Sequence, residues 1–330
     1  MLLSRVAESV YWAGRYLERV EATARLVKVH SELILDLPKS AGFGWSPLLA
    51  VTGTSEAFEE NHAAQIEEDV IRFLTVDANS PTSILSSVTA ARYNFRLTRN
   101  VLPASAWEQL NQLFLWVVQS RTLCVDRRTR NGRMDRVIRD CQMLRGMLDG
   151  TMSHDEAYSF WEIGSLVERA DMTTRVLDVQ AGVLSADASH RNAGVETYSD
   201  LTWTTMLRSL SAEQMFRRTS KSEIASGPDA LRFLLRDPQF PRSVEHCLTQ
   251  ISRSLLELPR YEAPMLCCAD VQRQLVDSAF AGLGAAGLHG YMDELQVAIG
   301  HLHGAIAETF FVTGAAVATS EAGTSLLATA

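Results

Sequence analysis

The chain has 330 residues, of which 46% are hydrophobic and 21% charged, and its formal net charge is −8. This composition excludes a disordered or fibrous protein and allows a well-filled core. The acidic balance argues against a general nucleic-acid binder, and no apolar run approaches the roughly 18 to 20 residues that a membrane-spanning helix needs.

The spacing of apolar residues predicts helices along the whole chain. Over residues 3–27 apolar side chains recur every three or four positions, which places one apolar stripe along a first long helix. Residues 160–177 repeat this pattern. Shorter helices are expected to begin near Trp45 and near Trp203, and further apolar helices are expected over residues 110–118 and 295–311.

Two proline-containing turns predict further helix starts. Pro81-Thr-Ser83 and Pro241-Arg-Ser243 each place a serine where it can cap a following helix. Strand alternation bounded by hairpin turns is absent from the sequence, so we expect an all-α fold. The polar residues 185–199 predict a surface loop, and residues 315–330 predict a loose C-terminal tail.

Three matched segments predict an internal duplication. The segment Tyr11-Trp-Ala-Gly-Arg-Tyr-Leu-Glu-Arg-Val-Glu-Ala-Thr-Ala-Arg returns as Trp161-Glu-Ile-Gly-Ser-Leu-Val-Glu-Arg-Ala-Asp-Met-Thr-Thr-Arg. Two later matches, beginning at Trp45 and Trp203 and at Phe73 and Phe233, follow in the same order. We therefore expect two pseudo-symmetric helical repeats, residues 1–145 and 146–314, packed together as one integrated domain.

The duplicated segments also hold the candidate site. Their charged residues border the apolar stripe, so their side chains are placed at the edge of the core. Glu18 and Glu168 are the candidate catalytic acids or bases. The candidate binding residues are Arg15, Glu18, Arg19, Glu21, Arg25, Arg92, Arg96, Glu168, Arg169, Asp171 and Arg175.

These charges allow several pairings. Arg15 with Glu18, and Glu21 with Arg25, can pair within the first helix. Across the bundle, pseudo-symmetry lets Glu18 meet Arg169, and Arg19 meet Glu168. One interpretation is an internal ion-pair network that fixes helix register. The other is a polar cleft whose arginines grip an anionic or zwitterionic group such as a peptide terminus or a phosphate.

Several segments of the sequence resemble a known family. The sequence is similar to the Alpha-E family, a bacterial helical domain named for its Glu-Arg motif. The similarity lies in Ser4-Arg-Val-Ala-Glu8, in the segment that holds Glu18-Arg19, and in the later Val167-Glu168-Arg169-Ala-Asp171. The resemblance covers nearly the whole chain. Tyr93 stands where many relatives have a glutamate, and Phe95 stands where they have a small residue. The resemblance therefore implies no functional acidic residue in the helix that contains Tyr93 and Phe95.

The resemblance implies a functional context. Such proteins accompany circularly permuted ATP-grasp ligases and transglutaminase-like proteins, in some cases with a proteasome-related peptidase. This context implies peptide or amide-bond chemistry, with the helical protein as a scaffold or substrate holder. The alternatives are an enzyme in its own right that uses Glu18 or Glu168, and a purely structural interaction module.

Other charged and metal-ligating patterns are weaker. Eight arginines between positions 121 and 145 alternate with aspartates, which favours a salt-bridged surface over a nucleic-acid site. Glu59-Glu-Asn-His62 is a Glu-x-x-His pattern without a second copy, so no di-iron or other metal site is expected. The sequence holds no P-loop, GxSxG or HExxH motif, and no cofactor is predicted.

The compartment is predicted from the N-terminus and the cysteines. Arg5 and Glu8 fall where a signal peptide would need an apolar stretch. The five cysteines include no Cys-x-x-Cys pair and fit reduced thiols better than a disulfide framework. We therefore expect a cytoplasmic protein with no membrane association.

Overall fold

The computed structural model describes residues 2–38, 43–189, 199–220, 226–277, 283 and 285–311, and within these ranges every regular element is an α-helix. The helices are α1 (Ser4–Asp36), α2 (Ser46–Thr52), α3 (Ser55–Glu59), α4 (Glu67–Thr75), α5 (Ile84–Leu97), α6 (Ala104–Gln119), α7 (Arg121–Val125), α8 (Arg127–Thr151), α9 (Glu156–Ser189), α10 (Ser199–Ser209), α11 (Glu213–Thr219), α12 (Gly227–Arg236), α13 (Val244–Leu256), α14 (Glu262–Asp277) and α15 (Ala285–Phe310). The all-α prediction is confirmed.

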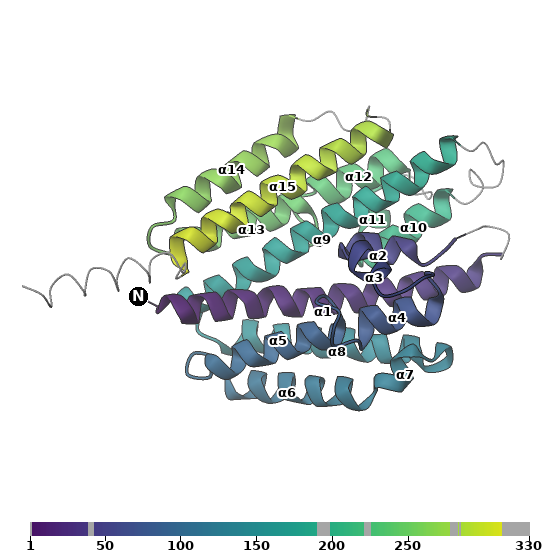
Figure 1. The fold of residues 1–330 in the computed structure, drawn as a ribbon. Helices are drawn as coiled ribbons and strands as arrows, with labels where there is room; N and C mark the ends of the chain where they lie inside the picture. The colour runs from purple at the N-terminus through teal and green to yellow at the C-terminus, as the bar shows by residue number, and fades with distance from the viewer. Residues whose placement is uncertain are drawn as a thin grey trace, which may run out of the picture.

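Two long helices form the centre of the molecule. In Figure 1, α1 and α9 lie side by side, with α5, α6 and α8 on the outer side of α1 and α13, α14 and α15 on the outer side of α9. Each long helix therefore has neighbours on several sides. This is why α1 buries residues around most of its circumference instead of along a single stripe.

The central helices approach each other closely at two glycines. A Cβ built on Gly14 would collide with the carbonyl oxygen of Trp161, and one built on Gly164 would collide with the carbonyl oxygen of Tyr11. The hydroxyl of Ser165 also donates a hydrogen bond to the carbonyl oxygen of Gly14, at 3.4 Å. Only glycine allows the two backbones to come this near.

The predicted serine caps are confirmed on both sides of the molecule. Ser83 accepts a hydrogen bond from the Ser86 backbone N–H at 3.0 Å, and Ser243 accepts one from the His246 backbone N–H at 3.1 Å. Each serine hydroxyl also donates to a carbonyl six residues earlier. The two turns thus have the same geometry.

Aromatic contacts are matched in the same way. Phe58 meets Phe73 edge-on with ring centroids 5.3 Å apart, and Phe216 meets Phe233 edge-on at 5.6 Å. These equivalent contacts are what a duplication would produce, while the duplication itself stays a prediction. So does its division of the chain; residue 145 lies within α8.

The loop predicted over residues 185–199 is partly wrong. Residues 185–189 continue α9 and Ser199 begins α10, while residues 190–198 lie outside the described part of the chain. The helical turns already formed in α9 extend into this polar stretch because serine, alanine and aspartate do not break a helix as glycine or proline would. The predicted tail, residues 315–330, also lies outside the described residues.

Candidate functional site

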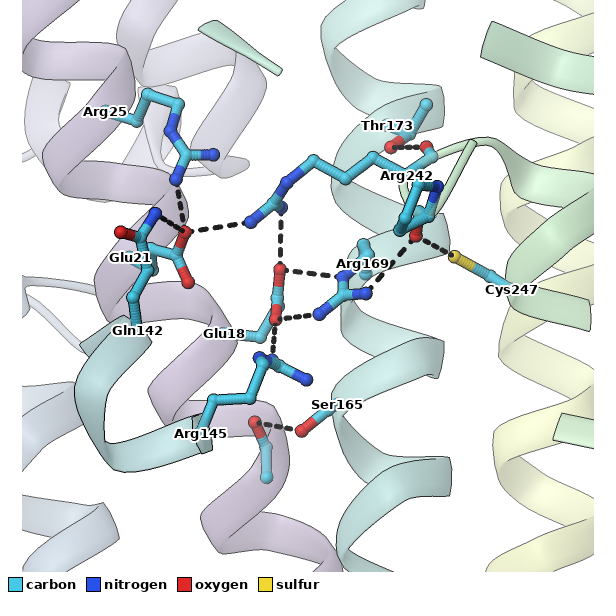
Figure 2. A network of polar contacts seen from close by, with 12 residues as sticks. Glu18, Glu21, Arg25, Gln142, Arg145, Ser165, Arg169, Thr173, Arg242 and Cys247 are labelled. Atoms are coloured by element: carbon cyan, nitrogen blue, oxygen red, sulfur yellow. Dashed lines mark hydrogen bonds and ion pairs between the residues drawn. The ribbon is translucent and has the colours of Figure 1, made fainter. Parts of the chain in front are cut away.

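Glu18 of α1 is surrounded by three arginines from three other parts of the chain. Arg169 of α9 makes a two-pronged contact, with its Nε and Nη2 each 3.0 Å from a carboxylate oxygen. Arg242, from the turn before α13, donates from Nη1 at 2.8 Å, and Arg145 of α8 donates from Nη2. Figure 2 shows these guanidinium groups converging on the carboxylate.

The second carboxylate on this face belongs to Glu21, one turn along α1. It accepts hydrogen bonds from Arg25 of the same helix and from Arg242 Nη2, the latter at 2.9 Å. The predicted pair of Glu21 with Arg25 is therefore confirmed. Arg242 bridges Glu18 and Glu21, so the turn before α13 is fastened to two successive turns of α1 (Figure 2).

The glutamate of α9 makes the reciprocal arrangement. Glu168 of α9 accepts hydrogen bonds from Arg19 Nε at 2.6 Å and from Arg15 Nε at 2.7 Å. Each Glu-Arg pair thus reaches across to the other: Glu18 to Arg169, and Arg19 to Glu168. This cross-bundle pairing was predicted from the sequence and is confirmed.

These contacts form two clusters between the central helices, which together are called the Glu–Arg network. The first cluster holds Glu18, Glu21, Arg25, Arg145, Arg169 and Arg242, and the second holds Arg15, Arg19 and Glu168. The carboxylates of the network are sealed from solvent, since Glu18 and Glu168 are each only 1% exposed. Its arginines are less uniformly buried, and the Arg145 side chain is 34% exposed. The network is therefore an anionic centre enclosed by guanidinium groups that extend toward the surface.

The arginines keep both glutamates ionised. Burial by itself would raise the pKa of Glu18, but the charges of Arg169, Arg145 and Arg242 outweigh it and hold that pKa well below its usual value. Burial likewise opposes ionisation of Glu168, and Arg19 and Arg15 lower its pKa nonetheless. Neither carboxyl group holds a proton to donate at neutral pH.

A tyrosine–histidine pair lies beside Glu168. The hydroxyl of Tyr11 and Nδ1 of His303 are 2.8 Å apart. Burial, and then the charge of Arg15, lower the pKa of His303 to about 4. Burial raises the pKa of Tyr11 to about 12. Both side chains are therefore neutral at pH 7, and they form an uncharged contact next to the ion pairs.

One predicted pairing is wrong. Arg15 does not pair with Glu18 within α1; it contacts Glu168 across the helix interface. The three guanidinium groups from α8, α9 and the turn before α13 already surround the Glu18 carboxylate. An interhelical partner thus replaces the local one, as tertiary packing commonly does for charges at a buried face.

Two predicted site residues lie away from the network. Arg92 donates from Nε to the Asn111 side chain at 2.7 Å, and its guanidinium group lies over the rings of Trp107 and Phe114. Arg96 is exposed and lies over the ring of Tyr93. Both side chains point from α5 toward α6 or the surface, so they do not face the α1–α9 interface.

Asp171 and Arg175 pair with each other one turn apart on α9, at 2.9 Å. They extend the charged row of that helix beyond Glu168, and within the described part of the chain no hydrogen bond or ion pair joins them to the network, although the charges of Asp171 and Arg15 interact. Gly53, at the end of α2, approaches the Arg175 guanidinium group, where an added Cβ would lie 3.0 Å from Nη1. The Arg175 guanidinium group therefore packs against the end of α2.

Sequence reasoning missed Arg145 and Arg242 as partners of Glu18. The sequence groups Arg145 with the seven other arginines of residues 121–145, of which Arg127 and Arg136 form partly exposed ion pairs with Glu67 and Asp140. Arg130 is buried and also pairs with Glu67. Arg242 follows Pro241 in the capping turn. The matching turn in the first half has Thr82 at this position, so the repeat gave no signal.

The described residues contain no group of three or more His, Cys, Asp or Glu side chains placed to hold a metal ion. His62, of the Glu-x-x-His pattern, stacks on Phe58 with ring centroids 4.2 Å apart. The five cysteines are free thiols. Among the helices of the described ranges, none combines the length and the apolar character required to cross a membrane.

Comparison with known proteins gives a family and few further relatives. The sequence model of the Alpha-E family, described as "a predicted alpha-helical domain with a conserved ER motif", matches residues 2–311. Uncharacterized proteins of Mycobacterium bovis and Mycobacterium tuberculosis are 25% and 24% identical over 283 residues. Each match covers 77% of this chain but 30% of the relative, so the chain spans less than a third of their length. No solved structure matches.

Proposed function

The chain belongs to the Alpha-E family, and we propose that it is an accessory protein of a peptide- or amide-bond-modifying system rather than the catalyst of that system. Its partners in this proposal are an ATP-grasp ligase-like protein and a transglutaminase-like protein, with a proteasome-related peptidase as a further candidate. The Glu–Arg network serves it as an internal clamp that fixes the surfaces presented to these partners.

The observation that carries the proposal is the burial of both motif glutamates. A general acid or base must come within hydrogen-bond distance of the proton that it transfers. Glu18 and Glu168 are 1% exposed, and their oxygens are occupied by arginines from four parts of the fold. A substrate group would have to displace buried charge-assisted hydrogen bonds to reach either of them.

The relatives support an accessory role in a second way. The matched region occupies 30% of each mycobacterial chain, so in those proteins it is part of a longer polypeptide. When two domains are covalently joined, each experiences the other at a high effective concentration. A separate chain of the same family can supply the same surface to a separate partner.

The proposal revises where a substrate would be held. A cleft formed by the glutamates themselves does not fit their burial. A peptide or anionic substrate is instead expected on a surface that the clamp positions, and the network contributes through rigidity. The purely structural interpretation of the motif therefore becomes part of the accessory function instead of an alternative to it.

The experiment co-expresses the tagged chain with the ATP-grasp ligase-like and transglutaminase-like proteins of its own genome. We expect a stable complex by size-exclusion chromatography and a change in ATP consumption by the ligase when this chain is added. The matched variant is the triple replacement Arg15→Met, Arg19→Met and Glu168→Leu, which removes one set of buried charges together and so need not destabilise the fold.

The outcomes separate the candidate functions. A folded triple variant that binds its partner more weakly than the wild type, and changes ATP consumption less, supports the clamp and the accessory role. A folded triple variant that binds its partner but abolishes product formation would assign a catalytic role to Glu168. If the wild-type chain forms a complex with neither protein, the proposal is overturned.

A further inference from the structure

An open groove of about 1030 Å³ runs between α1, α5 and α6. Its aromatic lining consists of Trp12 and Tyr16 from α1, Tyr93 from α5 and Phe114 from α6. Tyr93 and Leu97, which also lines the groove, are 54% and 51% exposed. We call this feature the α1–α5 groove. Large apolar side chains exposed together along one groove are characteristic of a binding surface.

The Glu–Arg network lies directly behind the aromatic wall. Trp12 stacks on Tyr16 with ring centroids 5.6 Å apart. The guanidinium group of Arg15 lies 5.2 Å from the Trp12 ring, and that of Arg19 lies 5.7 Å from the Tyr16 ring. Because Glu168 holds both arginines, the clamp fixes the two rings that face the groove.

The groove has cationic groups without partners. Arg5 and Arg121 line it, and neither has an ion-pair partner within the described part of the chain. In Figure 1, α1 begins at the end of the bundle where α5 ends, and α7, which starts at Arg121, lies toward the other end. Glu8 is the one acidic residue among those that line the groove.

The matching region of the second half is bridged by a hydrogen bond and lacks the two rings of α1. Trp12 corresponds by the sequence repeat to Glu162, and Asn94 corresponds to Ser254. In the structure the Ser254 hydroxyl donates a hydrogen bond to the Glu162 carboxylate, so α9 and α13 are bridged at this level. Tyr16 corresponds to Leu166, which is buried. An open aromatic groove is thus not required by this helical packing.

We propose that the α1–α5 groove binds an extended peptide that carries an aromatic side chain and a carboxylate. The lining of α1 extends from Arg5 to Tyr16, about 17 Å of helix, which accommodates roughly five extended residues. The aromatic side chain packs on the rings of Trp12, Tyr16 and Tyr93, and the carboxylate pairs with Arg121 or Arg5.

Polar groups suited to a peptide backbone lie on the same surface. Ser9 and Asn94 line the groove, and no hydrogen bond of either side chain is formed within the described residues. A peptide is favoured over a nucleic acid because the whole chain carries a net charge of −8, which repels a polyanion, and because Glu8 lies in the groove. This inference rests on the proposed function, since the peptide is the substrate that the accessory protein holds for its partner.

The test uses three labelled pentapeptides on the full chain. The first is Ala-Ala-Phe-Ala-Glu with a free C-terminus, the second replaces Phe by Ala, and the third replaces Glu by an amidated Lys. We expect the first peptide to bind, measured by fluorescence anisotropy and by quenching of tryptophan emission, and each of the other two to bind at least about ten-fold more weakly.

Two groove variants and two matched controls locate the binding. Tyr93→Ala is expected to weaken the binding of the first peptide about ten-fold, and the double variant Arg5→Ala, Arg121→Ala to remove the preference for it over the amidated lysine peptide. The controls are Leu115→Ala, which removes an exposed apolar side chain of α6 outside the groove lining, and Arg128→Ala, which removes an exposed arginine. Both are expected to bind as the wild type does.

Several results would overturn the inference. One is equal binding of all three peptides, another is binding unchanged by Tyr93→Ala, and a third is displacement of the first peptide by a 20-nucleotide single-stranded DNA. Peptide binding without a partner complex would leave the groove assigned and overturn the accessory role. A partner complex with no binding of any of the three peptides would support the accessory role and overturn the peptide groove.

Discussion

Three arginines around one buried carboxylate are more than charge balance requires. Glu18 contacts Arg145, Arg169 and Arg242, so the removal of its charge would leave several guanidinium groups facing one another. Desolvating such groups costs several kcal/mol each unless a counter-charge is present. The carboxylate is therefore the element of the network whose loss the fold tolerates least.

We predict that Glu18→Gln lowers the free energy of unfolding by about 3–5 kcal/mol, because the buried arginines lose their counter-charge while the shape of the side chain is kept. Urea unfolding followed by circular dichroism measures the change. The matched control is Glu68→Gln, which removes an exposed partner of Arg72 and is expected to cost less than about 1 kcal/mol. Equal stabilities of the two variants would show that Glu18 is not clamped in solution.

His303 gives the stability of the protein a dependence on pH. Its pKa in the folded state is about 4, against 6.5 for an ordinary histidine, because burial and the charge of Arg15 disfavour the imidazolium. The groups that face it are Tyr11, Trp12 and Arg15, with the charge of Glu168 nearby. Between these two pKa values the unfolded chain binds the proton that the folded chain does not.

The expected sign follows from that difference. Stability from His303 is complete above about pH 6.5 and falls as the pH is lowered toward 4. The lowered pKa values of Glu18 and Glu168 add a slope of the same sign as the pH nears 4.5, because the unfolded chain takes up protons on these carboxylates there and the folded chain does not, so the contribution of His303 is read from the difference between two proteins. Melting temperatures of the wild type and His303→Gln between pH 7.5 and 4.5 test this. A variant that loses as much stability as the wild type would contradict it.

At the scale of elements, the closest contact is the crossing of α1 and α9. Gly14 and Gly164 let each backbone approach a carbonyl oxygen of the other helix. The reciprocal Glu-Arg pairs lie one turn beyond these glycines, at positions 18–19 and 168–169. The crossing therefore fixes the distance between the two helix backbones that each arginine side chain must span. A wider separation would lengthen every ion pair between the two helices.

We predict that Gly14→Ala destabilises the protein by about 1–3 kcal/mol or more, because the new methyl group overlaps the Trp161 carbonyl and pushes the helices apart. Gly146→Ala in α8 is the matched control, since a Cβ there meets nothing within 4 Å. Its better helix propensity should stabilise the fold by up to about 1 kcal/mol. Thermal unfolding of both variants measures the difference, and shifts of the same sign would disprove this explanation of Gly14.

At the scale of the whole molecule, α1 and α9 belong to both sides of the fold. The first packs on α5 and α8 and the second on α13 and α15, yet their most extensive contact is with each other. Short helices also cross over, because α2 packs on α9 and α10 packs on α1 (Figure 1). Neither side keeps its core intact when the other is removed.

One cooperative unfolding transition is therefore expected. Circular dichroism and tryptophan fluorescence should report the same urea midpoint, since Trp107 and Trp116 belong to the first side and Trp161 and Trp203 to the second. Glu18→Gln should shift both signals together. Separate midpoints that differ by more than the error of the fits would indicate two independently stable domains.

The sequence by itself determined the helical class and the two serine caps, and it allowed the reciprocal pairing of Glu18-Arg19 with Glu168-Arg169 as one of several pairings. These follow from local rules: apolar periodicity places a residue on a helix face, a hydroxyl before a helix caps it, and a repeat places like positions in like surroundings. Tertiary structure decided that Arg145 and Arg242 complete the Glu18 cluster, that Arg15 pairs with Glu168, and that Arg92 and Arg96 face away. The physical reason is that the sequence fixes the direction of a side chain relative to its own helix, whereas its partner depends on how closely and at what register distant helices pack.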